Sequence, residues 1–380
     1  MKPLQGLLIL DFSQFLSGPS AAMRLADLGA RVIKIEKPGI GDICRQLYIS
    51  NLELDGDSTL FHSINRNKQS YAADLKNPDD LARVKKLIAQ ADVLIQNFRP
   101  GVMERLGLGW EAVRELNPRL VYGVVTGYGT NGPWVGKPGQ DLLTQSVSGL
   151  TWLNGNADQP PMAFGLAVSD LAASAHLVQG ILAVLVRRGI DGQGGLVEVS
   201  LLESTLDLQF EVATTFLNDG GKAPIRSNVN NGHAYLGAPY GIYATTDGYL
   251  ALAMGSVLKL GELLDLPALA AYADPKSWFN QRDEIKALIA EHLRVKPTQY
   301  WLNRLEPADY WCAEVLSWNQ LWKTKAFQAL DFEQEVTRQD GPSLKTTRCP
   351  IRIDGQVYKS PLGAPRVGQH TEEITRTFSL

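Results

Sequence analysis

The first 125 residues alternate between short apolar runs and helical patterns, and this alternation restricts the fold more than any other feature. An apolar run covers residues 7–10, an Ala- and Leu-rich helical segment follows to Leu28, and a second apolar run covers residues 31–35. Pro19 suits the first turn of a helix, where its missing N–H costs nothing, and Gly29 suits the stop. The order strand, helix, strand predicts a parallel sheet with helices on both faces.

The same alternation continues along the chain. The pattern predicts helices over residues 78–90 and 110–116, and strands over residues 71–75, 93–95, 120–125 and 196–201. A longer helix is expected from Asp170 to Arg188, because apolar residues recur there at helical spacing and Gly189 follows the basic last turn. Asp170 would then stand at the start of that helix.

The composition changes near residue 220, where a stretch rich in Gly, Asn and Pro breaks every earlier period. Beyond it, residues 241–254 are typical of two strands joined by a turn at residues 246–248, and residues 283–293 and 298–305 are typical of helices. We therefore expect an α/β protein with a large domain over residues 1–220 and a smaller α+β domain over residues 221–329.

Composition limits the ligands and the compartment. The 380 residues are 44% hydrophobic and 20% charged with a net charge of −3, which favours small ligands over nucleic acid or an anionic membrane. Cys44, Cys312 and Cys349 are too far apart to suggest a disulfide framework, and the histidines lack metal-ligand spacing. With a short N-terminal apolar run and no later stretch expected to reach membrane-spanning length, we expect a cytoplasmic protein without a metal or a tightly bound cofactor.

Two nucleotide-binding motifs can be weighed in this sequence. Glu36 ends the second strand where a ribose-binding acid would lie, but the preceding turn carries Gly18 alone instead of three glycines, which argues against NAD. No phosphate-binding loop of the ATPase type is present; Lys222 follows Gly221 without the required hydroxyl residue. Binding of a nucleotide near the first helix remains open.

Basic residues gather at the predicted strand ends of the large domain. Because ligands of open α/β sheets bind at the carboxyl ends of strands, these cations could hold phosphates, although each alone could simply be solvated. They are Lys37, Lys68, Lys76, Arg99, Arg105 and Lys137.

Asp170 has two interpretations. Aspartate is a preferred N-cap, and most aspartates at helix starts do only that. In the same position a helix dipole would hold a carboxylate ionised, so the residue could also act as a nucleophile. His233, in the Gly- and Asn-rich segment, could reach an active site from a loop, but a surface role is the more common one.

Several separate stretches resemble the class III CoA-transferases, a family that includes formyl-CoA:oxalate and carnitine CoA-transferases as well as 2-methylacyl-CoA racemases. The resemblance covers almost the whole chain, and its motifs are specific jointly more than singly. They are LLILDFSQFLSGPSAAMRLADLGARVIKIEKPGIGD, ADVLIQNFRPGVMERLGLGWEAVRELNPRLVYGVVTGYGTNGP, GQDLLTQSVSG, VSDLAA, GGLVEVSLLES and VGQHTEEI.

The resemblance implies that Asp170 attacks an acyl-CoA thioester, forms an aspartyl anhydride and then an aspartyl-CoA thioester, and passes CoA to an acceptor carboxylate. Acyl-CoA and small carboxylates would be the substrates. Asp170 would lie at a strand-to-helix turn. By the same resemblance, the CoA contacts would be Leu16, Ser17, Lys37, Ala73, Asp74, Leu75, Lys76, Asn97, Phe98, Arg99, Arg105 and Lys137. Lys68 matches no such contact and is expected to be solvated.

Gln140 distinguishes transfer from racemisation. Racemases of the family need a base there, and an amide cannot accept the proton, so Gln140 would instead hydrogen-bond the thioester oxygen. The glycine-rich loop of the oxalate-using branch is reduced here to residues 230–233, which leaves oxalate without specific support. An acyl-CoA isomerase and a CoA-binding protein whose Asp170 is only a cap remain as alternatives.

The resemblance also implies an assembly. Family members are interlocked ring-shaped homodimers with a Rossmann-like large domain that the C-terminal segment completes. We therefore expect residues 330–380 to join residues 1–220 in one discontinuous large domain.

Overall fold

The computed structural model describes residues 2–47 and 51–380. The chain divides into two compact units. The domain limits expected near residues 220 and 330 remain a prediction. Unit 1 comprises Met1–Thr144, Ala167–Leu208 and Ala329–Leu380, and unit 2 comprises Gln145–Leu166 and Gln209–Gln328.

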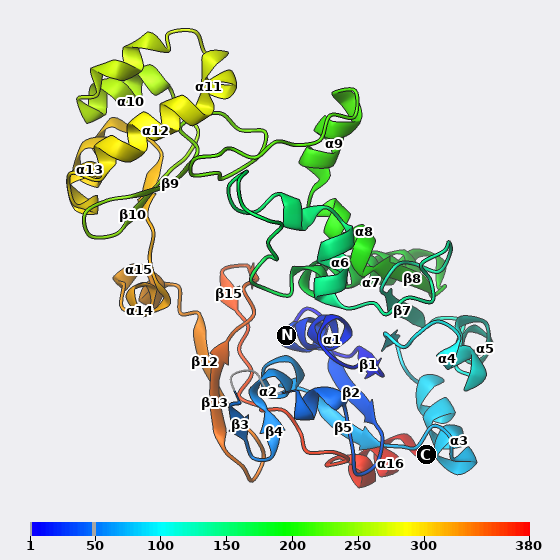
Figure 1. The fold of residues 1–380 in the computed structure, drawn as a ribbon. Helices are drawn as coiled ribbons and strands as arrows, with labels where there is room; N and C mark the ends of the chain where they lie inside the picture. The colour runs from blue at the N-terminus through cyan, green and yellow to red at the C-terminus, as the bar shows by residue number, and fades with distance from the viewer. Residues whose placement is uncertain (1, 48–50) are drawn as a thin grey trace. The chain divides into compact units, whose positions relative to one another are not determined.

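Unit 1 contains a six-stranded parallel sheet in the order β5-β2-β1-β6-β7-β8 (Figure 1). The expected alternation of strands and helices in an α/β fold is confirmed. Its strands are β1 (Leu8–Asp11), β2 (Arg31–Glu36), β5 (Gln69–Ala72), β6 (Val93–Gln96), β7 (Val121–Thr126) and β8 (Gly195–Ser200). The strand expected over residues 71–75 begins and ends earlier, so that residues 73–75 follow β5 in a turn.

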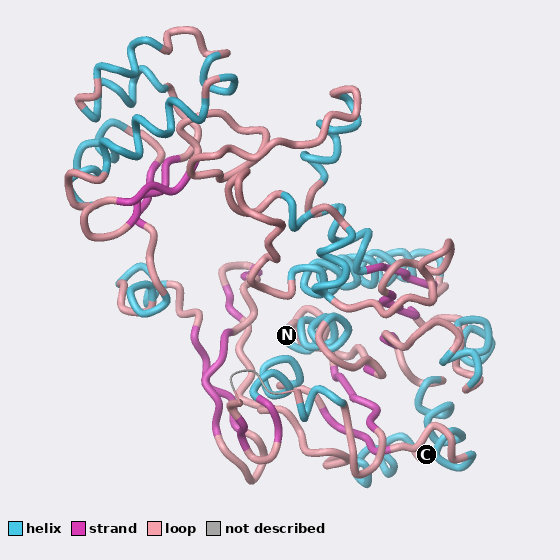
Figure 2. The backbone as a smooth tube through the Cα atoms, in the orientation of Figure 1, coloured by secondary structure: helices cyan, strands magenta, loops and turns pink. Residues whose placement is uncertain are grey.

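Helices cover the sheet, and short antiparallel pairs lie outside it; Figure 2 shows β12 and β13 as such a pair. The helices of unit 1, with α6 extending past Thr144, are α1 (Ser17–Asp27), α2 (Thr59–Asn65), α3 (Pro78–Ile88), α4 (Val102–Arg105), α5 (Trp110–Leu116), α6 (Asp141–Val147), α7 (Val168–Asp191), α8 (Leu201–Asp207) and α16 (Thr371–Phe378), with the 3₁₀ turn η1 (Ile43–Gln46). The short strands are β3 (Glu53–Leu54), β4 (Asp57–Ser58), β12 (Glu333–Thr337), β13 (Ser343–Thr347), β14 (Arg352–Ile353) and β15 (Gln356–Val357).

Alternating side chains of the strands feed two cores. Leu10 and Leu94 belong to a cluster that includes Leu87 of α3, whereas their neighbours Ile9 and Val93 belong to a second cluster with side chains of α1 and α7. Each such buried side chain contributes about 1.5–3 kcal/mol of hydrophobic stabilisation. Packing of the two cores fixes the parallel strands in place. The carboxyl ends of the central strands therefore all lie at the same edge of the sheet.

Helix α7 differs from its expected limits. It begins at Val168 and ends at Asp191, with Gly192 in the left-handed conformation (φ 75°) as its C-cap, so Gly189 does not stop it. By length and by a mean hydropathy of 1.5 the helix could cross a membrane, and the expectation that no stretch reaches that length was wrong. A core helix meets the same criterion, and Leu177 of α7 is fully buried.

Unit 2 has a three-stranded antiparallel sheet, β11-β10-β9. The two strands expected within residues 241–254 pair across the expected turn, and the helices expected over residues 283–293 and 298–305 are present. The elements are β9 (Gly241–Ala244), β10 (Tyr249–Leu252), β11 (Cys312–Glu314), α9 (Phe210–Asn218), α10 (Val257–Leu264), α11 (Ser277–Asn280), α12 (Arg282–Leu293), α13 (Thr298–Leu305), α14 (Trp318–Leu321), α15 (Lys325–Ala329, which runs into unit 1), η2 (Leu150–Trp152), η3 (Pro267–Ala271) and η4 (Glu306–Ala308).

The C-terminal segment closes the outer edge of β5. The backbone N–H of His370 donates to the Ser70 carbonyl at 3.0 Å, and the Ala72 N–H donates to the Thr371 hydroxyl at 2.9 Å. Edge strands left open would offer these groups to another chain. The arrangement ties residues 368–371 and α16 to the large sheet (Figure 1).

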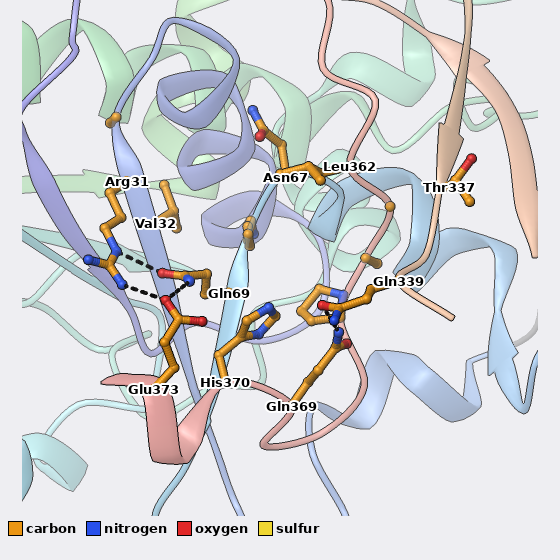
Figure 3. Close-up of a pocket in the computed structure, with 15 residues that line it drawn as sticks. Arg31, Val32, Asn67, Gln69, Thr337, Gln339, Leu362, Gln369, His370 and Glu373 are labelled. Atoms are coloured by element: carbon orange, nitrogen blue, oxygen red, sulfur yellow. Dashed lines mark hydrogen bonds and ion pairs between the residues drawn. The ribbon is translucent and has the colours of Figure 1, made fainter. Parts of the chain in front are cut away.

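Beside this contact lies a cavity of about 350 Å³ at the amino-terminal ends of β2 and β5 (Figure 3). Arg31 and Glu373 in its lining form an ion pair at 3.5 Å, and Gln69 joins them by accepting from Arg31 at 2.7 Å and donating to Glu373 at 3.2 Å. None of the predicted catalytic or CoA-binding residues is among its described lining residues. We therefore interpret this cavity as a gap left where α16 packs against the large sheet.

Candidate active site

A second cavity, of about 490 Å³, lies at the carboxyl ends of the strands of unit 1, where ligands of open α/β sheets bind. We call it the carboxyl-end cavity. It brings together eight of the predicted site residues: Leu16, Ser17, Asn97, Phe98, Arg99, Lys137, Gln140 and Asp170. Phe15, Leu47, Leu60, Val125, Thr126, Val135, Asp141 and Leu201 are among the further residues that line it.

Asp170 is the third residue of α7, and its N-cap interpretation was wrong. Ala167 occupies the N-cap and makes no side-chain cap hydrogen bond. Asp170 instead lies within the first turn, where the positive end of the helix dipole favours a carboxylate. The expected strand-to-helix turn was also wrong, because α6 and η2 lie between β7 and α7 in the chain.

The environment of Asp170 disfavours its ionised form. Burial of the carboxyl, and then the negative charge of Asp141, raise its pKa to about 6, while hydrogen bonds from the hydroxyl and the backbone N–H of Ser17 act in the opposite direction. A carboxylate with a raised pKa is more basic, and perturbed carboxyl groups in cavities are typical of catalytic sites. Asp170 therefore combines access to a cavity with raised basicity.

Asp141 was not among the predicted site residues. Its side chain is buried at 9% exposure, and its Oδ1 accepts the backbone N–H of Ser169 at 2.8 Å. The Ser169 hydroxyl accepts a hydrogen bond from Thr205 at 2.8 Å. The residue beside Asp170 is thus held through both its backbone and its side chain. The only signal in the sequence was the position of Asp141 directly after Gln140.

Two glycines allow the loop after β7 to fold back on itself. A Cβ atom placed on Gly127 would lie 2.5 Å from the Cα of Gly139, so only glycine permits this approach. Gly127 directly follows β7, and Gly139 directly precedes Gln140. The contact therefore brings Gln140 and Asp141 to the cavity.

The loop between β1 and α1 carries Leu16 and Ser17. Asn97 fixes it, because its side chain donates to the Gln14 carbonyl at 2.7 Å and accepts the Gln14 N–H at 2.8 Å. Phe15 takes a positive φ of 62°, a conformation uncommon for a non-glycine residue. This backbone path presents Ser17, the first residue of α1, to Asp170.

Lys68 was expected to be solvated, and this was wrong. Its side chain is fully buried, and its ammonium group pairs with Asp11 at 2.8 Å and donates to Pro19 O and Asn65 Oδ1, each at 2.8 Å. It precedes β5 rather than following a strand. Lys68 is a buried support of the β1–α1 loop and of the start of α1.

The remaining predicted cations differ in position. Arg99 and Lys137 line the carboxyl-end cavity, and the Lys137 ammonium lies 4.9 Å from the ring centre of Trp134. Lys37 follows β2, residues 73–76 follow β5, and Arg105 ends α4; they are not among the described lining residues of the cavity. Each of these residues follows the carboxyl end of a strand or, in the case of Arg105, ends the short helix after one.

His233 belongs to unit 2, where its Nε2 pairs with Glu211 at 3.0 Å and its Nδ1 accepts the Tyr235 N–H at 3.2 Å. Within residues 2–47 and 51–380, no group of three or more His, Cys, Asp or Glu side chains is arranged to hold a metal. The expectation of a protein without metal stays a prediction.

A half-buried carboxyl group with a raised pKa, in a cavity at the carboxyl end of a parallel sheet, is the arrangement of an α/β enzyme. Residues 4–371 match the sequence profile of CoA-transferase family III. The chain therefore belongs to this family of enzymes, and the predicted class is confirmed.

Known proteins agree with that assignment over nearly their full length. The acetyl-CoA:oxalate CoA-transferase of Acetobacter aceti is 35% identical over 99% of this chain and 96% of its own. The human succinyl-CoA:glutarate CoA-transferase is 34% identical over 99% of this chain and 86% of its own. The crystal structure of a CaiB/BaiF family protein from Brucella suis has a TM-score of 0.84 at 27% identity, covering 99% of both chains.

Proposed function

We propose that this enzyme moves CoA from an acyl-CoA to a small carboxylic acid through covalent intermediates on Asp170. The observation that carries the proposal is the position of Asp170: a carboxyl with a pKa of about 6, lining a cavity beside two hydrogen-bond donors of Ser17. Covalent catalysis divides one difficult transfer into easier steps, and thioester energy is conserved throughout. No ATP is required.

The sequence of bonds follows from that position. An oxygen of Asp170 attacks the thioester carbonyl, the C–S bond breaks, and CoA leaves as the thiolate with the electron pair. The thiolate then attacks the Asp170 carbonyl of the resulting anhydride, releases the donor acid and forms an aspartyl-CoA thioester. The acceptor carboxylate attacks this thioester, and the thiolate finally attacks the acceptor's acyl carbon and restores free Asp170.

Ser17 and Gln140 can stabilise the charges that develop in these steps. The hydroxyl and the backbone N–H of Ser17 lower the pKa of Asp170, and the same donors could stabilise the oxyanion that forms on the aspartyl intermediate. Gln140 lines the same cavity and carries an amide donor for the thioester oxygen of the substrate. An amide is not a base for α-proton transfer, so Gln140 supports transfer over racemisation.

The cations at the strand ends supply phosphate contacts for CoA. Arg99 and Lys137 line the cavity itself, and we assign them the contacts closest to the reacting end. Lys37, Lys76 and Arg105 are exposed and would hold the more distant phosphates. Leu16, Phe98, Asn97 and residues 73–75 complete the proposed CoA contacts.

Small dicarboxylates are the proposed acceptors. The relatives from Acetobacter aceti and human are named for oxalate and glutarate, two dicarboxylates of different length. The resemblance gave no specific support for oxalate, so we propose the class and not one acid. A screen of acetyl-CoA and succinyl-CoA against oxalate, succinate and glutarate would identify the pair.

We further propose that the enzyme is a cytoplasmic homodimer. The outer face of α7 supports association, because Leu171, Val186 and Ile190 are 47%, 70% and 86% exposed. Burying such side chains against a second copy would remove apolar surface from water. Sedimentation analysis of the pure protein tests this part.

Trapping with hydroxylamine tests the covalent mechanism. The enzyme incubated with succinyl-CoA and hydroxylamine should carry a hydroxamate at Asp170, identified by peptide mass spectrometry, and Asp170→Asn should carry none. An unmodified peptide together with wild-type turnover in Asp170→Asn would contradict the proposal. Exchange of the substrate α-proton without CoA transfer would favour an isomerase instead.

A further inference from the structure

We propose that Asp141 is a positioning residue for the reaction, which fixes the first turn of α7 and destabilises the ionised form of Asp170 relative to its acylated form. This inference rests on the proposed covalent role of Asp170. It assigns a function to a carboxylate that does not itself react.

The first part of the inference is geometric. The first N–H groups of an α-helix have no acceptor within the helix, and a side chain at the N-cap usually supplies one. Ala167 at the N-cap of α7 cannot, and Asp141 of α6 accepts the Ser169 N–H at 2.8 Å instead. Because Ser169 directly precedes Asp170, this hydrogen bond holds the backbone that carries the nucleophile.

The second part is electrostatic. Asp141, Asp170, Arg99 and Lys137 are the charged side chains among the described residues that line the carboxyl-end cavity. Burial is the larger cause of the raised pKa of Asp170, and the charge of Asp141 adds to it, while Ser17 of α1 opposes both. A carboxylate that only capped the helix could have been an asparagine, which keeps the acceptor oxygen and lacks the charge.

The charge matters because Asp170 loses its own charge when it reacts. Free Asp170 is an anion, whereas the aspartyl anhydride and the aspartyl-CoA thioester are neutral at this side chain. Repulsion by Asp141 therefore raises the free energy of the unreacted anion and leaves the acylated side chain nearly unaffected. The same repulsion makes the carboxylate more basic, and more basic carboxylates attack carbonyl carbons faster.

The test compares charge removal with loss of the hydrogen bond. Asp141→Asn keeps an acceptor for Ser169 and removes the charge, so the acid limb of kcat/KM should move about one pH unit to lower pH. The steady-state fraction of enzyme carrying the covalent adduct, measured by intact-protein mass spectrometry with succinyl-CoA, should fall. Asp141→Glu keeps the charge and should keep the wild-type limb. Asp141→Ser, a second uncharged acceptor, should repeat the result of Asp141→Asn.

Asp207→Asn is the matched control. Asp207 lies on α8, is 66% exposed at its side chain and pairs with His176 at 3.1 Å, so the same acid-to-amide change there should move neither readout. An acid limb that stays at the wild-type pH in both Asp141→Asn and Asp141→Ser, in an enzyme whose Asp170 is trapped by hydroxylamine, overturns this inference alone. Wild-type turnover in Asp170→Asn would instead overturn the proposed function.

Discussion

Two groups of charged side chains lie near the carboxyl ends of the central strands, and they differ in the signs of the charges that they bring together. In the first group Asp11 and Asp42 face Lys34 and Lys68, with Lys34 2.9 Å from Asp42 and Lys68 2.8 Å from Asp11. In the second group Asp141 and Asp170 line the same cavity, and the negative charge of Asp141 acts on Asp170. The first group is compensated, and the second is a pair of like charges.

The pKa values follow this difference. Burial would raise the pKa of Asp11, but the ammonium groups of Lys34 and Lys68 outweigh burial and lower it. At Asp170 burial raises the pKa and Asp141 adds to the rise. Opposite charges in contact are suited to holding a loop in place, whereas a carboxyl group whose pKa is raised in a cavity is suited to chemistry.

Replacement of Asp170, the proposed nucleophile, should have the largest effect. Asp170→Asn removes the carboxylate on which both proposed covalent intermediates would form, so kcat should fall by about 10⁴-fold or more. The unfolding midpoint should stay near that of the wild type, because the carboxylate is disfavoured by burial and by Asp141. Steady-state kinetics and thermal unfolding measured on the same preparation check both statements.

A substitution in the compensated group of Asp11, Asp42, Lys34 and Lys68 should act mainly on the stability of the folded protein. Lys68→Met leaves Asp11 buried without its closest cation, which should lower the free energy of unfolding by about 3–5 kcal/mol. Lys86→Met, on the exposed side of α3, should change it by less than about 0.5 kcal/mol. Urea unfolding distinguishes the two. Equal stability of both variants would show that the buried pair is no support for the loop.

The compensated group also shows which features could not be predicted from the sequence. The strands and helices that the sequence predicted lie within a few residues of their observed limits, because apolar runs and helical periods are local properties of the chain. Lys68 and Asp141 were missed because their roles depend on partners 57 and 28 residues away, Asp11 and Ser169. Asp170 was selected as a candidate through motif resemblance, while its place in the first turn of α7 depended on where the helix begins.

The cations of the cavity should affect substrate binding. Arg99→Ala would remove the proposed charge-assisted contact to a CoA phosphate, worth about 1.5–3 kcal/mol, so KM for CoA esters as a group should rise about 10- to 100-fold. Lys76→Ala and Arg105→Ala, whose side chains lie outside the cavity lining, should raise it less. Arg114→Ala, at 61% exposure on α5, is the control and should leave KM unchanged. Unchanged KM in all three test variants would mean that the CoA site is elsewhere.

The smallest expected effect is a shift of the acid limb of kcat/KM, and its direction should distinguish the influence of Ser17 on Asp170 from that of Asp141. Asp170 must be ionised to attack, so kcat/KM should fall tenfold per pH unit below about pH 6. Ser17→Ala removes the hydroxyl that stabilises the carboxylate, and the acid limb should move upward by about 0.4 to 1 pH unit, the equivalent of one ordinary hydrogen bond.

This shift is opposite in sign to the one expected for Asp141→Asn. Ser20→Ala, which changes a hydroxyl one turn further along α1, is the matched control and should leave the limb in place. Shifts of opposite sign in Ser17→Ala and Asp141→Asn would mean that the hydrogen-bond donor Ser17 and the negative charge of Asp141 act in opposite directions on the ionisation of Asp170. A downward shift in Ser17→Ala would contradict the hydrogen bond, and the raised pKa of Asp170 would then have to be ascribed to burial and Asp141 without an opposing donor.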